Sequence, residues 1–355
     1  MKKRLLTIIL ASAMVLGITA CGGASDGQIK ETSGADTGET DQDKTLKEAS
    51  GETKVLKLAS DQGVDYPTMV ALQSFADEVN EKTDGRITIT LYPSAQLGDE
   101  NAYLQQLQFG AVDFAKSSVA SLAQFCDDLN VLSLPYLFDS TDHMFKCLDG
   151  ELGEELFTSL ESANIVGLGF ANNGSRCFFT KNQVKTADDL KNMKLRVQSS
   201  PLMLGLVECL GGFPQAIAST EVYSALQTGT VDGAENNINI YANESYYEQA
   251  PYFIKDNHNI QPEIIVVSKQ TWDGLSGEDQ AIIREAIDNA MEYQKELWME
   301  REHESEEKLL EAGVTIYEPT TEELEKFREK CQPIYEDAEL GKPYEEFVSK
   351  VRAIK

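Results

Sequence analysis

Short strand patterns alternate with amphipathic helix patterns along this chain, and the alternation limits its possible folds more than any other feature. Residues 55–60 (VLKLAS) and 86–93 (RITITLYP) alternate apolar and polar side chains as strands do. Residues 67–83, between them, carry apolar side chains at helical spacing. A second helix pattern at 100–110 ends in a glycine, and a strand pattern follows at 112–118. This order predicts an α/β fold with a mainly parallel sheet covered by helices.

The pattern starts again near residue 164 and indicates a second unit of the same kind. It continues through a strand at 194–198 (KLRVQ) and a helix at 201–210 to a buried strand at 263–269. Residues 277–311 then form an apolar-periodic, charge-rich stretch with neither proline nor internal glycine. A helix of this length runs about 50 Å, which exceeds the width of one small domain. We therefore expect two α/β lobes with interleaved chain segments and one long helix that spans both.

The N-terminus has the features of an export signal. Three basic residues at positions 2–4 precede an apolar run at 5–18 that is too short to span a bilayer comfortably. Small residues then lead to Cys21 in the sequence Ile-Thr-Ala-Cys, which resembles a bacterial lipobox. This predicts a lipoprotein signal peptide at 1–20 and an acylated Cys21 as the first mature residue. A plain secretory signal with an incidental cysteine is the alternative.

Residues 21–53 have the composition of a disordered tether. They contain no aromatic and almost no aliphatic side chains, so they cannot bury enough surface to offset the entropy of ordering. Such a linker has a mean reach of roughly 30 Å. We expect it to hold the remaining body close to the outer face of the cell membrane.

The charge of the chain excludes some classes of partner. The formal net charge is −28 at pH 7, and removal of the basic signal residues makes the mature protein still more acidic. This balance argues against nucleic acid and anionic lipid surfaces as partners.

No motif for catalysis or for a metal centre is present in the sequence. The three histidines form no helical metal pair, and both the GxSxG elbow and the phosphate loop are absent. The five cysteines after Cys21 are an odd number without CxxC spacing, which favours buried free thiols over a disulfide framework or a zinc site. We expect neither enzyme activity nor a cofactor. The alternative is a secreted hydrolase or lyase with an unrecognised site.

Arg196 is the most conspicuous charged residue of this acidic chain. It lies in KLRVQ, where alternation puts Leu195 and Val197 on one face and Arg196 on the other. Ligands of open α/β sheets bind beyond the carboxyl ends of strands and beside helix N-termini, where Ser199 and Ser200 can act as caps and anion donors. On these residues alone, an ion pair with a surface acid explains Arg196 better than an anion site does.

Five segments together resemble the solute-binding proteins of tripartite ATP-independent periplasmic (TRAP) transporters, the DctP-like family. They match in order and spacing and cover essentially the whole body: TDGRITITLYPSAQLGDE (83–100), FGAVDFAKSSVASLA (109–123), LNVLSLPYLF (129–138), VKTADDLKNMKLRV (184–197) and EVYSALQTGTVDGAEN (221–236). The resemblance implies a two-lobed periplasmic-binding-protein (Venus-flytrap) fold that closes around its ligand by a hinge. Lobe I would comprise 54–173 plus 262–300, and lobe II 174–261 plus 301–355.

The resemblance also implies which residues bind the ligand. Arg196 corresponds to the arginine that forms a bidentate salt bridge with a substrate carboxylate, and Arg176 of NNGSRCFFTK to a second pocket arginine. Asn236 of GAEN corresponds to the side chain that helps to orient the first arginine and the carboxylate. His258 of DNHNI is expected near the cleft in a supporting role. Glu100, which ends the first matching segment, is the fifth candidate ligand-binding residue.

Three positions depart from the family pattern. Ser219 stands where relatives often have a pocket aromatic, and Tyr66 stands where histidine is frequent. Lys116 of FAKSS adds a cation that we expect on the surface rather than in the cleft. These changes leave the carboxylate anchor intact and leave the rest of the ligand open.

The resemblance implies a lipid-anchored, extracytoplasmic protein that captures an organic acid for a TRAP transporter and ion-coupled uptake. Its partners would be the small and large membrane subunits of that transporter. C4-dicarboxylates, sugar acids such as uronates, 2-oxo or hydroxy acids and aromatic acids all satisfy one arginine clamp. A ligand-binding receptor that feeds a sensory kinase is the alternative function.

Overall fold

The computed structural model describes residues 52–355. The predicted signal peptide, the lipidation site Cys21 and all but the last two residues of the predicted tether lie outside the described residues. Within 52–355, no helix is long and apolar enough to cross a membrane.

The first of two sheets has the strand order β2-β1-β3-β10-β4. Strand β1 is parallel to β2 and β3, whereas β10 is antiparallel to β3 and β4. The strands are β1 (Lys54–Ala59), β2 (Ile87–Tyr92), β3 (Phe114–Ser118), β4 (Ile165–Ala171) and β10 (Glu263–Ser268).

The second sheet has the order β11-β9-β5-β8-β6-β7. Strand β5 is antiparallel to β8 and β9, whereas β6 is parallel to β7 and β8. The strands are β5 (Ser175–Thr180), β6 (Lys194–Val197), β7 (Phe213–Ala216), β8 (Gly233–Asn236), β9 (Tyr252–Ile260) and β11 (Thr315–Tyr317).

Both sheets are mixed but mainly parallel, as expected: one strand of each runs against all the others, β10 in the first sheet and β5 in the second. The reason for these two reversals lies in two short crossings between the sheets. Strand β4 ends at Ala171 and β5 begins at Ser175, while β9 ends at Ile260 and β10 begins at Glu263. A strand that enters a sheet directly from the other sheet, without a crossover helix, is free to run antiparallel to its neighbours.

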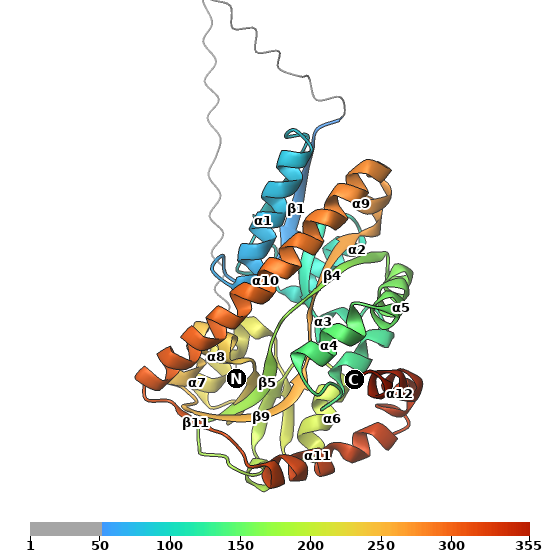
Figure 1. Ribbon diagram of the computed structural model, residues 1–355. Helices are drawn as coiled ribbons and strands as arrows, with labels where there is room; N and C mark the ends of the chain where they lie inside the picture. The colour runs from blue at the N-terminus through green and yellow to red at the C-terminus, as the bar shows by residue number, and fades with distance from the viewer. Residues whose placement is uncertain (1–51) are drawn as a thin grey trace, which may run out of the picture. The chain divides into compact units, whose positions relative to one another are not determined.

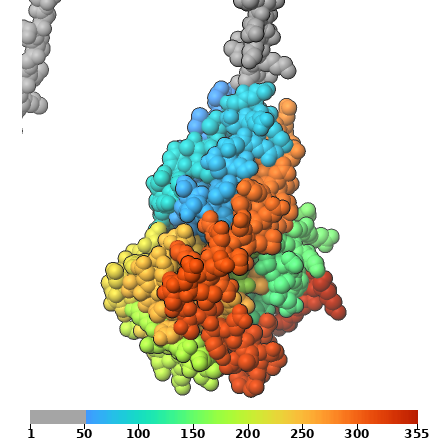
Figure 2. All heavy atoms as spheres, turned by 60° about the vertical axis from the view of Figure 1, so that its left-hand side comes forward, coloured from blue at the N-terminus to red at the C-terminus, as the bar shows by residue number. Residues whose placement is uncertain are grey.

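One long helix, α10 (Gly277–Glu311), belongs to both halves of the body, and its predicted bounds are confirmed. Ser276 caps its first turn by accepting a hydrogen bond from the Asp279 backbone N–H at 3.1 Å. The helix packs against α1 (Pro67–Lys82) beside the first sheet and α8 (Ile238–Asn243) beside the second. Figure 1 shows it running diagonally across both sheets, and Figure 2 shows its orange surface beside the blue segment at the top and the yellow segment lower down.

The other α-helices cover the sheets and fill the space between them. In the C-terminal part, α11 packs against α6, and in α12 the carbonyl oxygen of Val351 lies 3.3 Å from His143 Nε2 in α4. These helices are α2 (Glu100–Gln108), α3 (Val119–Leu122), α4 (Thr141–Leu148), α5 (Glu151–Leu160), α6 (Pro201–Cys209), α7 (Val222–Thr228), α9 (Lys269–Asp273), α11 (Thr321–Glu336) and α12 (Glu345–Ala353).

The described cysteines are free thiols. Cys209 is half-buried, and its Sγ lies 3.7 Å from that of Cys331, across the contact of α6 with α11. The buried thiols are those of Cys126, Cys147, Cys177 and Cys331.

Candidate functional site

A pocket of about 210 Å³ lies between the two sheets and takes its lining from both. It is smaller than the roughly 300–1,000 Å³ pockets of drug-sized ligands, so it suits a small solute. The first half contributes side chains that follow β1 and begin α2, and the second contributes side chains of β5, β6 and β8. The polar lining residues include Asp61, Gln62, Asp99, Glu100, Lys116, Arg176, Arg196, Gln198, Ser199, Ser219, Asn236 and Glu263.

Arg196 enters the pocket from β6, near the carboxyl end of a strand held between β7 and β8. Leu195 and Val197 are fully buried beside it, as the alternation predicts, and Arg196 itself is only 3% exposed. Its Nε donates to the carbonyl oxygen of Ile217 at 2.8 Å. Within residues 52–355, its two terminal nitrogens donate no hydrogen bond. They are therefore available for the two parallel hydrogen bonds that a guanidinium makes to a carboxylate.

Arg176 reaches the pocket from β5 but is already paired with a carboxylate. Its Nε donates to Glu235 Oε2 at 2.6 Å and its Nη2 to Glu235 Oε1 at 2.9 Å. Both side chains are buried, and their strands β5 and β8 are hydrogen-bonded neighbours. Burial alone would raise the pKa of Glu235, but the charge and hydrogen bonds of Arg176, together with the nearby His258, lower it to about 2. Arg176 therefore has less free capacity for a ligand than Arg196.

Asn236 lines the pocket at the end of β8 and contacts Arg176. Its Oδ1 accepts from Arg176 Nη1 at 3.2 Å and from the Asn237 backbone N–H at 2.9 Å. The family resemblance predicts that Asn236 helps to orient Arg196 and the ligand carboxylate. In this structure its side-chain oxygen contacts Arg176, and its role toward Arg196 stays a prediction.

His258 lies behind the pocket lining and is completely buried in β9. Its Nδ1 is 2.8 Å from Asp256 Oδ2 and its Nε2 is 3.5 Å from Glu235 Oε2. Burial by itself lowers the pKa of His258, but the charge of Asp256, the contact with that carboxylate and the charge of Glu235 raise it to about 9. A charged imidazole at this position supports Glu235 and acts on the pocket only through that residue.

Glu100 lines the opposite part of the pocket, at the first position of α2. Its carboxylate accepts hydrogen bonds from the Ser118 backbone N–H, from Ser118 Oγ at 2.9 Å and from Ser121 Oγ at 2.7 Å. Burial and the nearby charge of Asp61 raise the pKa of Glu100. The contacts fix the carboxylate beside the N-terminus of α3.

Lys116 is the pocket residue whose position was predicted wrongly from the sequence. The surface position expected for it is wrong, because Lys116 is 2% exposed and lines the pocket. Its Nζ lies 2.9 Å from Asp61 Oδ1 and 3.1 Å from Glu263 Oε1. Although burial alone would lower it, the pKa of Lys116 is raised well above its ordinary value by these two carboxylates. Nothing in the sequence FAKSS itself indicates this inward position, because the acidic partners of Lys116 lie far from it in the chain.

The acid end of the pocket, where Asp61, Asp99, Glu100 and Glu263 lie, is connected to the rest of the fold on two sides. Ser219, from the second half, donates to Asp61 Oδ2 at 2.8 Å. On the other side, Thr68 donates to Glu263 Oε2 at 2.6 Å and accepts from Gln294 Nε2 at 3.2 Å. Gln294 belongs to α10 and also bonds both backbone groups of Asn172, at a crossing between the sheets.

Two α/β halves that share a polar pocket with a buried, incompletely bonded arginine define a solute-binding protein of the two-lobed type. Within residues 52–355, no group of three or more histidine, cysteine or acidic side chains could hold a metal ion. The comparisons with known proteins give the same class and identify the family.

The family model for bacterial extracellular solute-binding proteins, family 7 (DctP), matches residues 58–340. A solute-binding protein of Chromohalobacter salexigens is 39% identical over 272 residues, or 76% of this chain and 80% of the relative. The C4-dicarboxylate-binding periplasmic protein DctP of Rhodobacter capsulatus is 30% identical over 291 residues, or 81% and 87%. A crystal structure of a TRAP periplasmic solute-binding protein from C. salexigens with bound D-glucuronate matches with a TM-score of 0.81 and 36% identity, covering 84% of this chain and all of that one.

The chain belongs to family 7 of the bacterial extracellular solute-binding proteins. The predicted family, the two-lobed fold and the absence of an enzyme activity are thereby confirmed.

Proposed function

We propose that this protein captures a sugar acid outside the cytoplasm and delivers it to a TRAP transporter, with Arg196 as the anchor of the ligand carboxylate. The free terminal nitrogens of the buried Arg196 side chain carry the proposal. Burial lowers the pKa of Arg196, because the guanidinium is deprived of water, and the charge of Glu235 offsets this effect only in part. The Glu235 Oε1 atom is 3.9 Å from Arg196 Nη1, too far for a hydrogen bond. A ligand carboxylate supplies the missing partner.

The sugar-acid class is favoured by the relatives and by the polar lining. D-Glucuronate is the ligand in the similar structure from C. salexigens. Hydrogen bonds to charged groups contribute about 1.5–3 kcal/mol each, whereas micromolar binding requires about 8 kcal/mol. The carboxylate alone is therefore insufficient, and the hydroxyl groups of a sugar acid add contacts to the amides and carboxylates of the pocket.

The proposal also covers where the protein is tethered and which two lobes close around the ligand. Acylation of Cys21 would tether the protein to the outer face of the membrane, where the small and large TRAP subunits receive the closed form. The lobes would be 54–173 plus 262–300 and 174–261 plus 301–355. His258, Asn236 and Arg176 would support the anchor, and Glu100 would contribute from lobe I.

The test is calorimetric titration of the purified protein and of Arg196→Ala with D-glucuronate and D-galacturonate. Loss of two charge-assisted hydrogen bonds, about 3–6 kcal/mol together, weakens binding by on the order of 10²- to 10⁴-fold. Arg196→Lys retains the charge but not the planar fork, and should lose part of this affinity. Arg301→Ala, on the solvent side of α10, is the matched control. Unchanged affinity in Arg196→Ala would refute the anchor.

A further inference from the structure

We infer that the carboxylates of Asp61 and Glu263, held together by Lys116, select a ligand whose second end is uncharged and carries hydroxyl groups. This inference rests on the proposed function, because it concerns the end of the ligand that lies away from Arg196. It distinguishes sugar acids with one carboxylate from acids with two. The specificity-determining residues would be Asp61 and Glu263, with Lys116 as a positioning residue.

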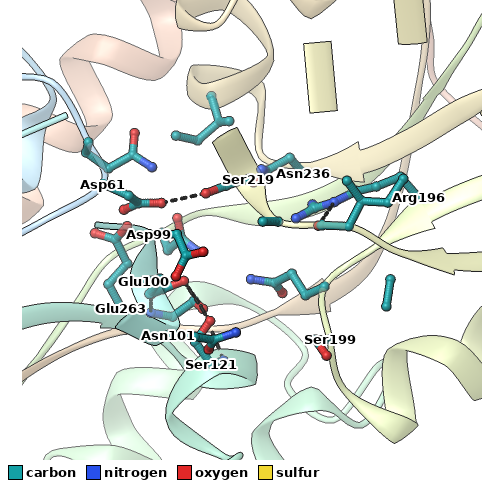
Figure 3. Close-up of a pocket in the computed structure, with 18 of the residues that line it drawn as sticks. Asp61, Asp99, Glu100, Asn101, Ser121, Arg196, Ser199, Ser219, Asn236 and Glu263 are labelled. Carbon is teal, nitrogen blue, oxygen red and sulfur yellow. Dashed lines mark hydrogen bonds between the residues drawn. The ribbon is translucent and has the colours of Figure 1, made fainter. Parts of the chain in front are cut away.

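The charge of the pocket is strongly divided between its two ends. Figure 3 shows Asp61, Asp99, Glu100 and Glu263 on one side and Arg196 on the other. Lys116 is the cation that accompanies these four acids in the pocket lining. The acid end therefore carries an excess of negative charge. A carboxylate is attracted to Arg196, and a second carboxylate on the same small molecule would be repelled at the other end.

The positive charge of Lys116 is not available to a second ligand carboxylate. Its side chain is 3% exposed, and its ammonium already lies within 3.1 Å of Glu263 and 2.9 Å of Asp61. The Asp61 and Glu263 side chains are 5% and 4% exposed. Lys116 lowers the pKa of Asp61, although burial raises it, and so keeps that carboxylate ionised. Its role is to hold two acceptors side by side.

The remaining polar groups of the lining also require hydrogen-bond donors from a ligand. Among the described residues, Gln62 Oε1 and Gln198 Oε1 are buried and have no hydrogen-bond partner. Gln62, next to Asp61, is 8% exposed, and Gln198 follows Arg196 by two positions. Carboxylate and amide oxygens accept hydrogen bonds, and sugar hydroxyls donate them. A ligand with one carboxylate and several hydroxyls satisfies both ends, whereas a carboxylate at the second end brings further acceptors to a place that needs donors.

The test compares two ligands with the same carbon skeleton. D-Glucuronate has one carboxylate and D-glucarate has one at each end. Calorimetric titration of the purified protein at pH 7 should give a Kd for glucarate at least about tenfold higher than for glucuronate. Malate, a C4-dicarboxylate, should bind at least as poorly as glucarate.

The residues are assigned with neutral, isosteric variants. Asp61→Asn and Glu263→Gln should weaken glucuronate binding and reduce the glucarate-to-glucuronate Kd ratio by at least about threefold. Asp65→Asn, at an exposed aspartate outside the pocket lining, is the matched control and should leave both Kd values unchanged. Circular dichroism of each variant checks its fold. Lys116→Met would leave two unpaired buried carboxylates, so it is compared only if its spectrum is native.

The possible failures are distinguishable. If no organic acid binds the wild-type protein, the proposed function fails. If glucarate binds as tightly as glucuronate and both need Arg196, the proposed function stands and the inference is overturned. If the glucarate-to-glucuronate Kd ratio of the wild type is high and stays unchanged in both Asp61→Asn and Glu263→Gln, the assignment to these residues is wrong.

Discussion

Replacing Glu235 by glutamine tests whether the buried charges behind the pocket stabilise the fold. Glu235 is 0% exposed and accepts two hydrogen bonds from Arg176, at 2.6 and 2.9 Å. It also lies 3.5 Å from His258 and 3.9 Å from Arg196. Glutamine preserves the shape and one acceptor but removes the charge that faces three cationic side chains.

The expected cost follows from the pKa of Glu235. The value falls from 4.5 to about 2, because the charge and hydrogen bonds of Arg176 outweigh the burial that raises it. At about 1.4 kcal/mol per pH unit, the folded state favours the carboxylate by about 3 kcal/mol. Removing one partner of a buried ion pair costs about 3–5 kcal/mol in other proteins. We expect Glu235→Gln to lower the free energy of unfolding by about 3 kcal/mol at pH 7.

The assay is urea unfolding followed by circular dichroism, with the slope of the transition checked for each variant. Glu318→Gln is the matched control, because Glu318 is the 74% exposed partner of Lys255 and should cost less than about 1 kcal/mol. Replacing both buried partners, in Arg176→Met/Glu235→Leu, should recover part of the loss. If Glu235→Gln is no less stable than Glu318→Gln, the buried charges do not stabilise the fold and the reasoning is refuted.

Two further predictions concern stability. The pKa of His258 is raised from 6.5 to about 9, mainly by Asp256 against the effect of burial, so its contribution is complete below pH 6.5 and is lost as the pH rises to 9. The free energy of unfolding of the wild type, measured by urea titration, should fall by about 3 kcal/mol between these pH values. A His258→Gln variant that loses the same free energy over this pH range would contradict the assignment. Gly233→Ala in β8 would place a methyl group 2.5 Å from the carbonyl oxygen of Phe179. The variant should therefore lose about 1–3 kcal/mol of unfolding free energy, measured by urea unfolding. Gly277→Ala has open space around it and is the control, and equal midpoints for the two variants would show that β8 has room for the methyl group.

The sequence predicted most of the regular elements because each is encoded locally. Helix α10 follows from a periodic stretch without proline or internal glycine, and α1 from its apolar face. Strand β9 (Tyr252–Ile260) was not predicted, because YFIKDNHNI does not alternate apolar and polar side chains. The buried Asp256 is paired with His258, and His258 also faces Glu235 on another strand. The reversed direction of β5 and β10 was also not predicted, because periodicity specifies a strand but not its neighbour.

The site was predictable where a residue type is informative by itself. Arg196 stands out as a cation near a strand end in an acidic chain, and the structure places it in the pocket. Lys116 was not predictable in this way, since a lysine is assigned to the surface unless its partners are known. Those partners, Asp61 and Glu263, lie far from it in the sequence and meet it only in the folded protein.

The hydrogen bonds from Gln294 through Thr68 to Glu263 join the long helix to the acid end of the pocket. Gln294 also fixes Asn172, where the chain passes from one sheet to the other. A ligand that bonds Glu263 competes for the same carboxylate that holds Thr68. If α10 shifts when the ligand binds, occupancy of the pocket and the placement of the helix are thermodynamically coupled, and the coupling is reciprocal. In that case a partner that holds α10 in one position would change the ligand affinity from outside the pocket.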